Sequence, residues 1–89
     1  MLIEWSPAAR VELRQIIDYL SHRNPAAALQ LKRSIEASVL ALSRRPHIYR
    51  PGRIGGTREM VVHPNYLVVY KVTDNIRILS VLHARQRYP

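Results

Sequence analysis

The sequence predicts an α+β domain in which a helical hairpin packs on one face of a small, mainly antiparallel sheet, in the order β-α-α-β-β-β. Two apolar stripes at helical spacing, each behind a capping residue and a proline, occupy residues 6–45. Strand-forming runs separated by turn residues follow at 58–82. The chain has 89 residues, which leaves room for one small core, so residues 1–89 are expected to form a single domain.

The first half of the chain predicts a short strand and two helices. Residues 2–5 form a strand too brief to stand without a sheet. Ser6-Pro7 and Asn24-Pro25 each place a capping side chain before a proline at the first helical position, which predicts a tight helical hairpin. Arg44, Arg45 and Pro46 are expected to end the second helix. The predicted buried stripes are Ala9, Leu13, Ile16, Ile17 and Leu20 in the first helix and Ala28, Leu31, Ile35, Val39 and Leu42 in the second.

The second half predicts a loop and a three-stranded meander. Residues 46–56 are rich in proline, glycine and arginine and are expected to form a loop. Strands are expected at 58–62, 66–72 and 76–82, joined by short turns. In the last strand, simple alternation places Ile76, Ile78, Ser80 and Leu82 on one face and Arg77, Leu79, Val81 and His83 on the other. Both faces carry apolar residues, so we expect both to be covered.

Basic residues are concentrated in the second half of the chain. Fourteen Lys and Arg residues against six acids give a formal net charge of +8 at pH 7, and twelve of the fourteen are arginine. Residues 1–36 hold five basic and four acidic side chains, whereas residues 37–89 hold nine basic ones and only Glu59 and Asp74. Since the guanidinium fork suits phosphate and carboxylate, this half is expected to meet a polyanion or an acidic protein surface.

Several classes of protein and site are not expected. No apolar stretch approaches the roughly 20 residues needed to span a bilayer, the N-terminus does not resemble a secretory signal, and the chain has no cysteine. A cytoplasmic protein with no membrane partner is therefore expected. The four histidines lack acidic or cysteine companions at ligand spacing, so neither a metal site nor a cofactor is predicted.

Four segments resemble the toxins of the ParE/RelE superfamily, the small basic partners in bacterial type II toxin–antitoxin pairs. They are Leu42-Ser-Arg-Arg-Pro-His-Ile-Tyr49, Gly56-Thr-Arg-Glu59, His63-Pro-Asn-Tyr66 with Tyr70, and the tail His83-Ala-Arg-Gln-Arg-Tyr-Pro89. Length and element order are similar too, and the pattern is closest to the ParE branch, which includes plasmid-stabilisation proteins. The resemblance implies a growth-inhibiting toxin that forms a hetero-oligomer with a cognate antitoxin.

The superfamily acts in two ways, and the resemblance leaves both open. RelE-like members cut messenger RNA on the ribosome, which requires activation of the ribose hydroxyl, stabilisation of phosphate charge and protonation of the leaving oxygen. If this chain is a nuclease, the catalytic candidates are Arg58, His83, Arg85 and Tyr88. Nuclease members, however, carry an arginine where this chain has Leu67, and often a lysine where it has Met60.

ParE-like members bind DNA gyrase and trap it on cleaved DNA, a role that needs a surface and no catalytic group. This action is favoured here, with the target-binding surface expected on a basic, arginine-rich face and an exposed C-terminal tail. Its candidate residues are Arg53, Arg58, His83, Arg85, Arg87 and Tyr88. Arg58 and Glu59 alternatively form a plain cross-strand charge pair, and His63 is expected to be a turn residue. A nucleic-acid-binding module without toxicity is a third hypothesis, although no helix carries a basic recognition face.

Overall fold

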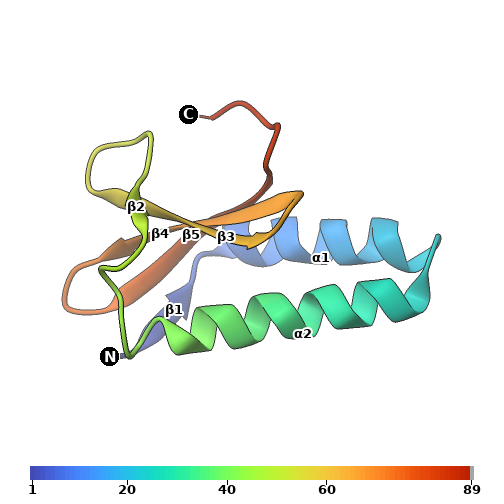
Figure 1. Cartoon of the computed structure of the whole chain (residues 1–89), viewed down its shortest axis with the longest axis horizontal. Helices are drawn as coiled ribbons and strands as arrows, with labels where there is room; N and C mark the ends of the chain where they lie inside the picture. The colour runs from blue at the N-terminus through green and yellow to red at the C-terminus, as the bar shows by residue number, and fades with distance from the viewer. Residues whose placement is uncertain (89) are drawn as a thin grey trace.

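A computed structural model describes residues 1–88 and confirms the predicted α+β class. Two helices cover one face of a twisted sheet (Figure 1). The helices are α1 (Pro7–Ser21) and α2 (Pro25–Ala41), and the strands are β1 (Ile3–Trp5), β2 (Arg50–Pro51), β3 (Thr57–His63), β4 (Tyr66–Val72) and β5 (Ile76–His83). The five strands lie in the order β1-β5-β4-β3-β2, in which only the β1–β5 pair is parallel. Within residues 1–88, neither helix has the length and apolarity needed to cross a bilayer.

Both helices begin where the caps predict. The Ser6 hydroxyl accepts a hydrogen bond from the amide of Ala9 at 3.0 Å, and the Asn24 side chain accepts one from Ala27 at 3.1 Å. The predicted end of α2 is wrong by several residues: the helix ends at Ala41, and Arg44 lies in the turns beyond it. Successive three-residue hydrogen bonds, from the Leu42 amide to Val39 and from the Arg44 amide to Ala41, tighten the chain there before the proline is reached.

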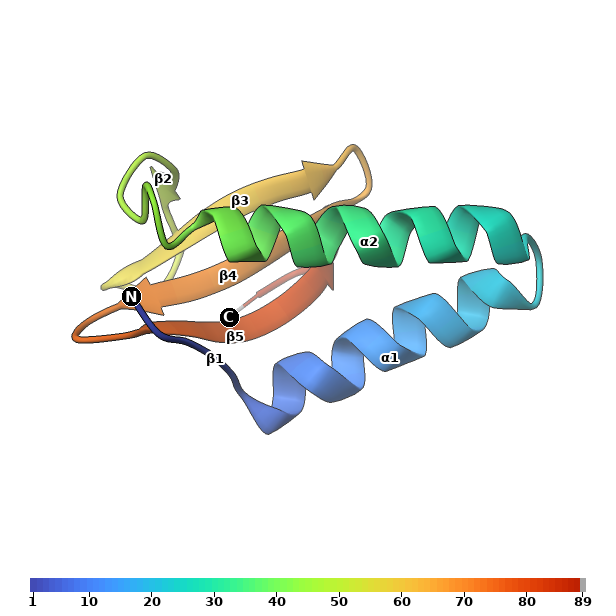
Figure 2. The same cartoon turned by 90° about the horizontal axis from the view of Figure 1, so that it is seen from below.

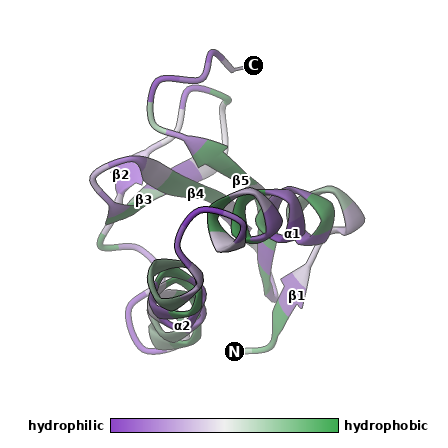
Figure 3. Cartoon of the chain, turned by 90° about the vertical axis from the view of Figure 1, so that its right-hand side faces the viewer, coloured by the Kyte–Doolittle hydropathy of each residue, from purple (hydrophilic) through white to green (hydrophobic). Residues whose placement is uncertain are grey.

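The main core lies between the helices and the sheet. Both predicted helical stripes reach it, with Ala9, Leu31, Ile35, Val39 and Leu42 buried and the remaining α1 stripe residues partly buried against them. Ala28 is buried as well. Figure 3, coloured by hydropathy, shows apolar and polar segments alternating along both helices. The sheet contributes Met60, Val68, Tyr70, Ile76, Ile78 and Val81 to this core.

The predicted faces of β5 are wrong beyond Ile78. Val69 pairs with Ser80, but Tyr70 pairs with Ile78, so Leu79 is an extra residue that forms a β-bulge. One extra residue exchanges the two faces of the strand for everything that follows. Val81 therefore packs with Ile76 and Ile78 under the helices, whereas Leu82 packs on the opposite side. Both faces of β5 are covered, as predicted.

The loop predicted at 46–56 contains a further short strand. Arg50 and Pro51 of β2 pair with Glu59 and Arg58 of β3. The amide of Gly52 then donates to the carbonyl of Thr57 at 2.8 Å, and a Cβ atom at Gly52 would collide with the Thr57 hydroxyl. Gly56 has a φ of +83°, a left-handed conformation that suits glycine. The loop therefore returns to β3 along a closely defined path.

Candidate functional site

The sheet face away from the helices, called here the open face, is covered by the C-terminal tail. Leu67, Val69 and Leu82 form a small apolar cluster on this face, and Tyr88 packs against it. The tail crosses the sheet on the side opposite the helices (Figure 1). The tail was expected to be exposed, and for Tyr88 this is wrong, because its ring covers apolar side chains that water would otherwise contact. Pro89 lies outside the described residues.

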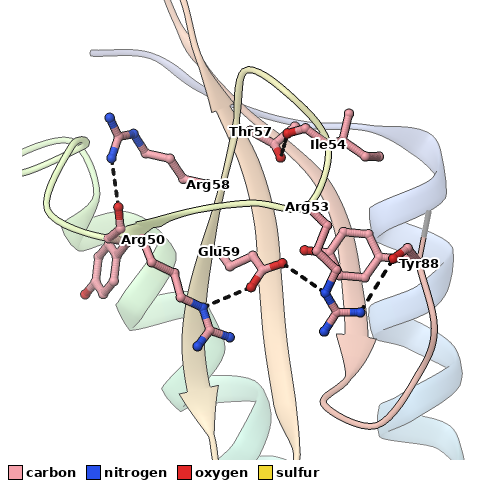
Figure 4. A network of polar contacts seen from close by, with 8 residues as sticks. Arg50, Arg53, Ile54, Thr57, Arg58, Glu59 and Tyr88 are labelled. Carbon is pink, nitrogen blue, oxygen red and sulfur yellow. Dashed lines mark hydrogen bonds and ion pairs between the residues drawn. The ribbon is translucent and has the colours of Figure 1, made fainter.

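Arg53 joins the tail to the sheet (Figure 4). Its guanidinium carbon lies 4.5 Å from the centre of the Tyr88 ring, and its Nη1 donates to the Tyr88 carbonyl at 3.5 Å. Its Nε lies 3.7 Å from the Glu59 carboxylate. Arg50 donates from Nε to the other oxygen of Glu59 at 2.9 Å. Two arginines of the loop thus converge on one carboxylate, which is only 5% exposed.

The Arg58 side chain binds backbone carbonyls of the loop after α2 and forms no ion pair with Glu59. Its Nη1 donates to the carbonyl oxygens of His47 at 3.0 Å and Tyr49 at 2.8 Å. The plain Arg58–Glu59 charge pair is therefore a wrong prediction, because adjacent residues of β3 point to opposite faces. The Tyr70 hydroxyl donates to the carbonyl of Pro46 at 2.7 Å, so the two side chains together satisfy three carbonyls of this loop. Burial raises the pKa of Tyr70, and the nearby Arg58 charge partly offsets that rise.

His83 lies on the helix side of the sheet, with Tyr66. The two rings meet edge to face with centroids 5.4 Å apart, and the His63 ring lies 5.7 Å from Tyr66 on the β3–β4 turn. The Nδ1 atoms of His63 and His83 accept hydrogen bonds from the amides of Asn65 at 3.0 Å and Arg85 at 3.2 Å. These bonds fix the turn at His63 and the start of the tail at His83.

The structure therefore separates the predicted site residues into three sets: one on the open face, one on the helix side and one on the exposed tail. Arg53 and Tyr88 meet on the open face, while Arg58 and His83 lie on the helix side. Arg85 and Arg87 are exposed on the tail between them. Glu59 and Arg50 were not predicted as site residues. The signal that points to Glu59 is its isolation, because it is the one acid between residues 37 and 73 of a strongly basic segment.

A second surface feature is a groove between the helices. As Figure 2 shows, α1 and α2 meet at their connecting turn and diverge toward β1. The groove has a volume of about 900 Å³, and the strongly exposed Leu40 forms part of its rim. Its apolar lining is Ile3, Trp5, Leu13, Ile17, Val39 and Leu40, and its charged lining is Arg10, Arg14, Asp18, Lys32 and Glu36. Within residues 1–88, no three His, Cys, Asp or Glu side chains gather closely enough to hold a metal ion.

Comparisons with known proteins give the family of the chain from a family model and a relative, and its fold from solved structures. Residues 3–88 match the family model described as "ParE toxin of type II toxin-antitoxin system, parDE". A protein of Sinorhizobium fredii named "Putative toxin Y4kP" is 36% identical over 88 residues, covering 98% of this chain and 92% of that protein. A solved structure of the chromosomal ParDE TA system from P. aeruginosa has a TM-score of 0.84 at 23% identity, covering 93% of this chain and 95% of that one. The YoeB dimer of Staphylococcus aureus has a TM-score of 0.63 at 18% identity, covering 99% and 98% respectively.

Proposed function

Because the chain belongs to the ParE toxin family of type II toxin–antitoxin systems, we propose that it stops growth by poisoning DNA gyrase and that a cognate antitoxin neutralises it. The observation that carries the proposal is that the four nuclease candidates do not meet at one point. Cleavage of RNA needs a base, an acid and a charge-stabilising group around a single phosphate. His83 and Tyr88 instead lie on opposite faces of the sheet, and Arg58 is bound to two backbone carbonyls.

The open face supports the same proposal. Leu67 occupies the position at which nuclease members carry an arginine, and it is buried with Val69 and Leu82 beneath Tyr88. A phosphate placed against this cluster would lose its hydration to apolar side chains, and Leu67 offers it no charge in place of the arginine. The Tyr88 hydroxyl is itself buried, so it is not presented to a substrate as an acid. A surface that only binds its target needs neither a phosphate-binding charge nor an accessible proton donor at this position.

The groove between the helices is the proposed antitoxin site. Its apolar floor suits the hydrophobic anchors of an amphipathic antitoxin segment, and Arg10, Arg14 and Lys32 suit acidic residues beside those anchors. Leu40 is 70% exposed at the groove, which leaves a large apolar side chain in water unless a partner covers it. The similar P. aeruginosa fold belongs to a ParDE toxin–antitoxin system, which agrees with a protein partner for this chain.

Two measurements on the purified protein separate the gyrase and ribosome targets. With gyrase, supercoiled plasmid and ATP, we expect cleaved DNA to accumulate when the complex is denatured. In a reconstituted translation reaction, we expect the transcripts to stay intact. Transcript cleavage without gyrase trapping would overturn the proposal and establish a RelE-like nuclease.

The antitoxin site is tested with a matched pair of variants on α2. Leu40→Glu places a charge in the groove, whereas Leu29→Glu places the same charge at an exposed position that does not line it. We expect Leu40→Glu to weaken binding to the product of the neighbouring short reading frame by about tenfold or more, since burying an unpaired carboxylate costs several kcal/mol. Leu29→Glu should bind normally. Equal binding by both variants would exclude the groove as the antitoxin site.

A further inference from the structure

Glu59 is the only charged side chain among residues 1–88 that is buried. A buried carboxylate is costly unless cations and hydrogen bonds compensate for its lost hydration. Arg50 donates a hydrogen bond to its Oε1 atom at 2.9 Å, and Arg53 forms an ion pair with its Oε2 atom at 3.7 Å, which has no hydrogen bond from residues 1–88. Both arginines precede the strand of Glu59 in the sequence. Neither of these arginines is buried, so the carboxylate holds two flexible side chains in place at the edge of the open face.

Arg53 connects Glu59 to the C-terminal tail, because the same guanidinium contacts both Glu59 and Tyr88. One guanidinium contacts Glu59 through Nε, the Tyr88 carbonyl through Nη1 and the Tyr88 ring through its flat face (Figure 4). The Tyr88 ring also packs on the apolar cluster of the sheet, and is therefore held by Arg53 and by Leu67, Val69 and Leu82. Without Glu59, the Arg53 and Arg50 guanidinium groups would repel each other and no carboxylate would hold them beside the sheet.

The tail is tied down at both ends, with its arginines between the two ties. At the start, the Ala84 amide donates to the Asn65 carbonyl at 2.7 Å and the Gln86 amide donates to the His83 carbonyl at 2.9 Å. At the end, Arg53 holds Tyr88. The side chains of Arg85 and Arg87 are exposed within this short span. A chain fixed at two points presents its exposed side chains in few orientations, which reduces the entropy lost when a partner orders them.

We propose that Glu59 is a positioning residue, which holds Arg53 over Tyr88 and thereby fixes residues 85–87 in the orientation that meets the target. The inference rests on the proposed function for the identity of that target. The ordering of the tail is a property of the free protein.

Two matched substitutions test the ordering of the tail in isotopically labelled protein without any target. Glu59→Gln removes the buried charge, and Glu4→Gln removes a carboxylate from the exposed Glu4–Arg77 pair, so that both variants change the net charge equally. In Glu59→Gln, we expect the backbone order parameter of Tyr88 to fall below about 0.6. We also expect the methyl signals of Leu67, Val69 and Leu82 to lose the ring-current shift caused by Tyr88. Glu4→Gln should match the parent.

The same variants are then measured with gyrase. A disordered tail should raise the concentration of toxin needed for half-maximal trapping by about threefold to tenfold, while the extent of trapping at saturation stays unchanged. Arg53→Gln should give the same result, and combining it with Glu59→Gln should add little, because both break one connection. Glu59→Asp, which keeps the charge, should recover part of the tail order.

The two proposals fail in distinguishable ways. An ordered Tyr88 in both Glu59→Gln and Arg53→Gln would overturn the positioning role, and so would a disordered tail with unchanged trapping. Failure of the parent to trap gyrase would overturn the target, while the order parameters would still decide whether Glu59 fixes the tail. Global unfolding of Glu59→Gln would show as loss of signal dispersion throughout the spectrum, in which case the exposed Arg53→Gln variant decides the question.

Discussion

Replacing Arg58 with alanine should destabilise the fold, although the sequence predicts it as a target-binding residue. The substitution removes two hydrogen bonds from a charged donor to the carbonyls of His47 and Tyr49. Hydrogen bonds from charged groups contribute roughly 1.5–3 kcal/mol each, and partial exposure of this pair reduces the expected total to about 2 kcal/mol. For a chain of 89 residues, the melting temperature should fall by roughly 8–16 °C.

Thermal unfolding followed by circular dichroism measures this loss directly. Arg45→Ala is the matched control, because it removes an exposed arginine from the same loop and should change the stability by less than about 0.5 kcal/mol. Arg58→Lys should fall between the parent and Arg58→Ala, since an ammonium keeps the charge but not the fork. The structural role of Arg58 would be refuted by a melting temperature within about 2 °C of the parent. Loss of gyrase trapping at that unchanged stability would place Arg58 on the target surface instead.

Three further predictions concern the core, the alkaline limit of stability and the tail. Ile35→Ala should cost about 2–4 kcal/mol in chemical denaturation, because Ile35 is fully buried between the helices and the sheet; a loss below about 1 kcal/mol would contradict that packing. The raised pKa of Tyr70 means that its contribution to stability is complete below its unfolded pKa of about 10 and is lost as the pH rises through its folded pKa. The free energy of unfolding should therefore decline above about pH 10, and it should decline less steeply in Tyr70→Phe. At neutral pH the Tyr70→Phe variant should be less stable than the parent, because it lacks the hydrogen bond to the Pro46 carbonyl. Tyr88→Phe should leave folding and trapping unchanged, because the hydroxyl has no hydrogen-bond partner among residues 1–88, whereas Tyr88→Ala should release the tail; a steep loss of activity in Tyr88→Phe would indicate that the hydroxyl takes part in chemistry.

Local signals in the sequence predicted the helices and strands well. The two cap-and-proline pairs place the starts of α1 and α2 correctly, and alternation of apolar residues locates β3, β4 and β5 to within one residue at each end. These features depend on side chains acting within a few residues of themselves. The short strand β2 was missed because two residues, one of them a proline, carry no periodic signal, and it forms only through its pairing with Arg58 and Glu59.

The site was predicted less well because it depends on contacts between distant residues. The chemistry of Arg53 and of Tyr88 makes each a candidate site residue, but their stacking joins positions 35 residues apart in the sequence, and neither residue predicts the other. The sequence suggests Arg58 as the partner of Glu59, whereas its partners in the fold are Arg50 and Arg53. The orientation of a strand decides which charges meet, and adjacent residues in a strand do not face each other.

The β-bulge at Leu79 decides where the tail residues lie, and distant side chains support it. The Ser6 hydroxyl donates to the Leu79 carbonyl at 3.0 Å, and the Glu12 carboxylate accepts from the Ser80 hydroxyl at 2.8 Å and the Val81 amide at 3.2 Å. These bonds satisfy backbone groups of β5 beyond the end of β1.

With strict alternation, His83 would lie on the open face beside the tail, where an acid–base pair with Tyr88 is easy to imagine. Because of the bulge, Leu82 lies on the open face instead, where Tyr88 covers it. His83 lies on the helix side, with its ring against Tyr66. One extra residue in β5 thereby separates the two groups that a nuclease mechanism would need to bring together. It also supplies the apolar floor on which the tail is held, so the geometry that disfavours catalysis also supports the tail that we propose to meet the target.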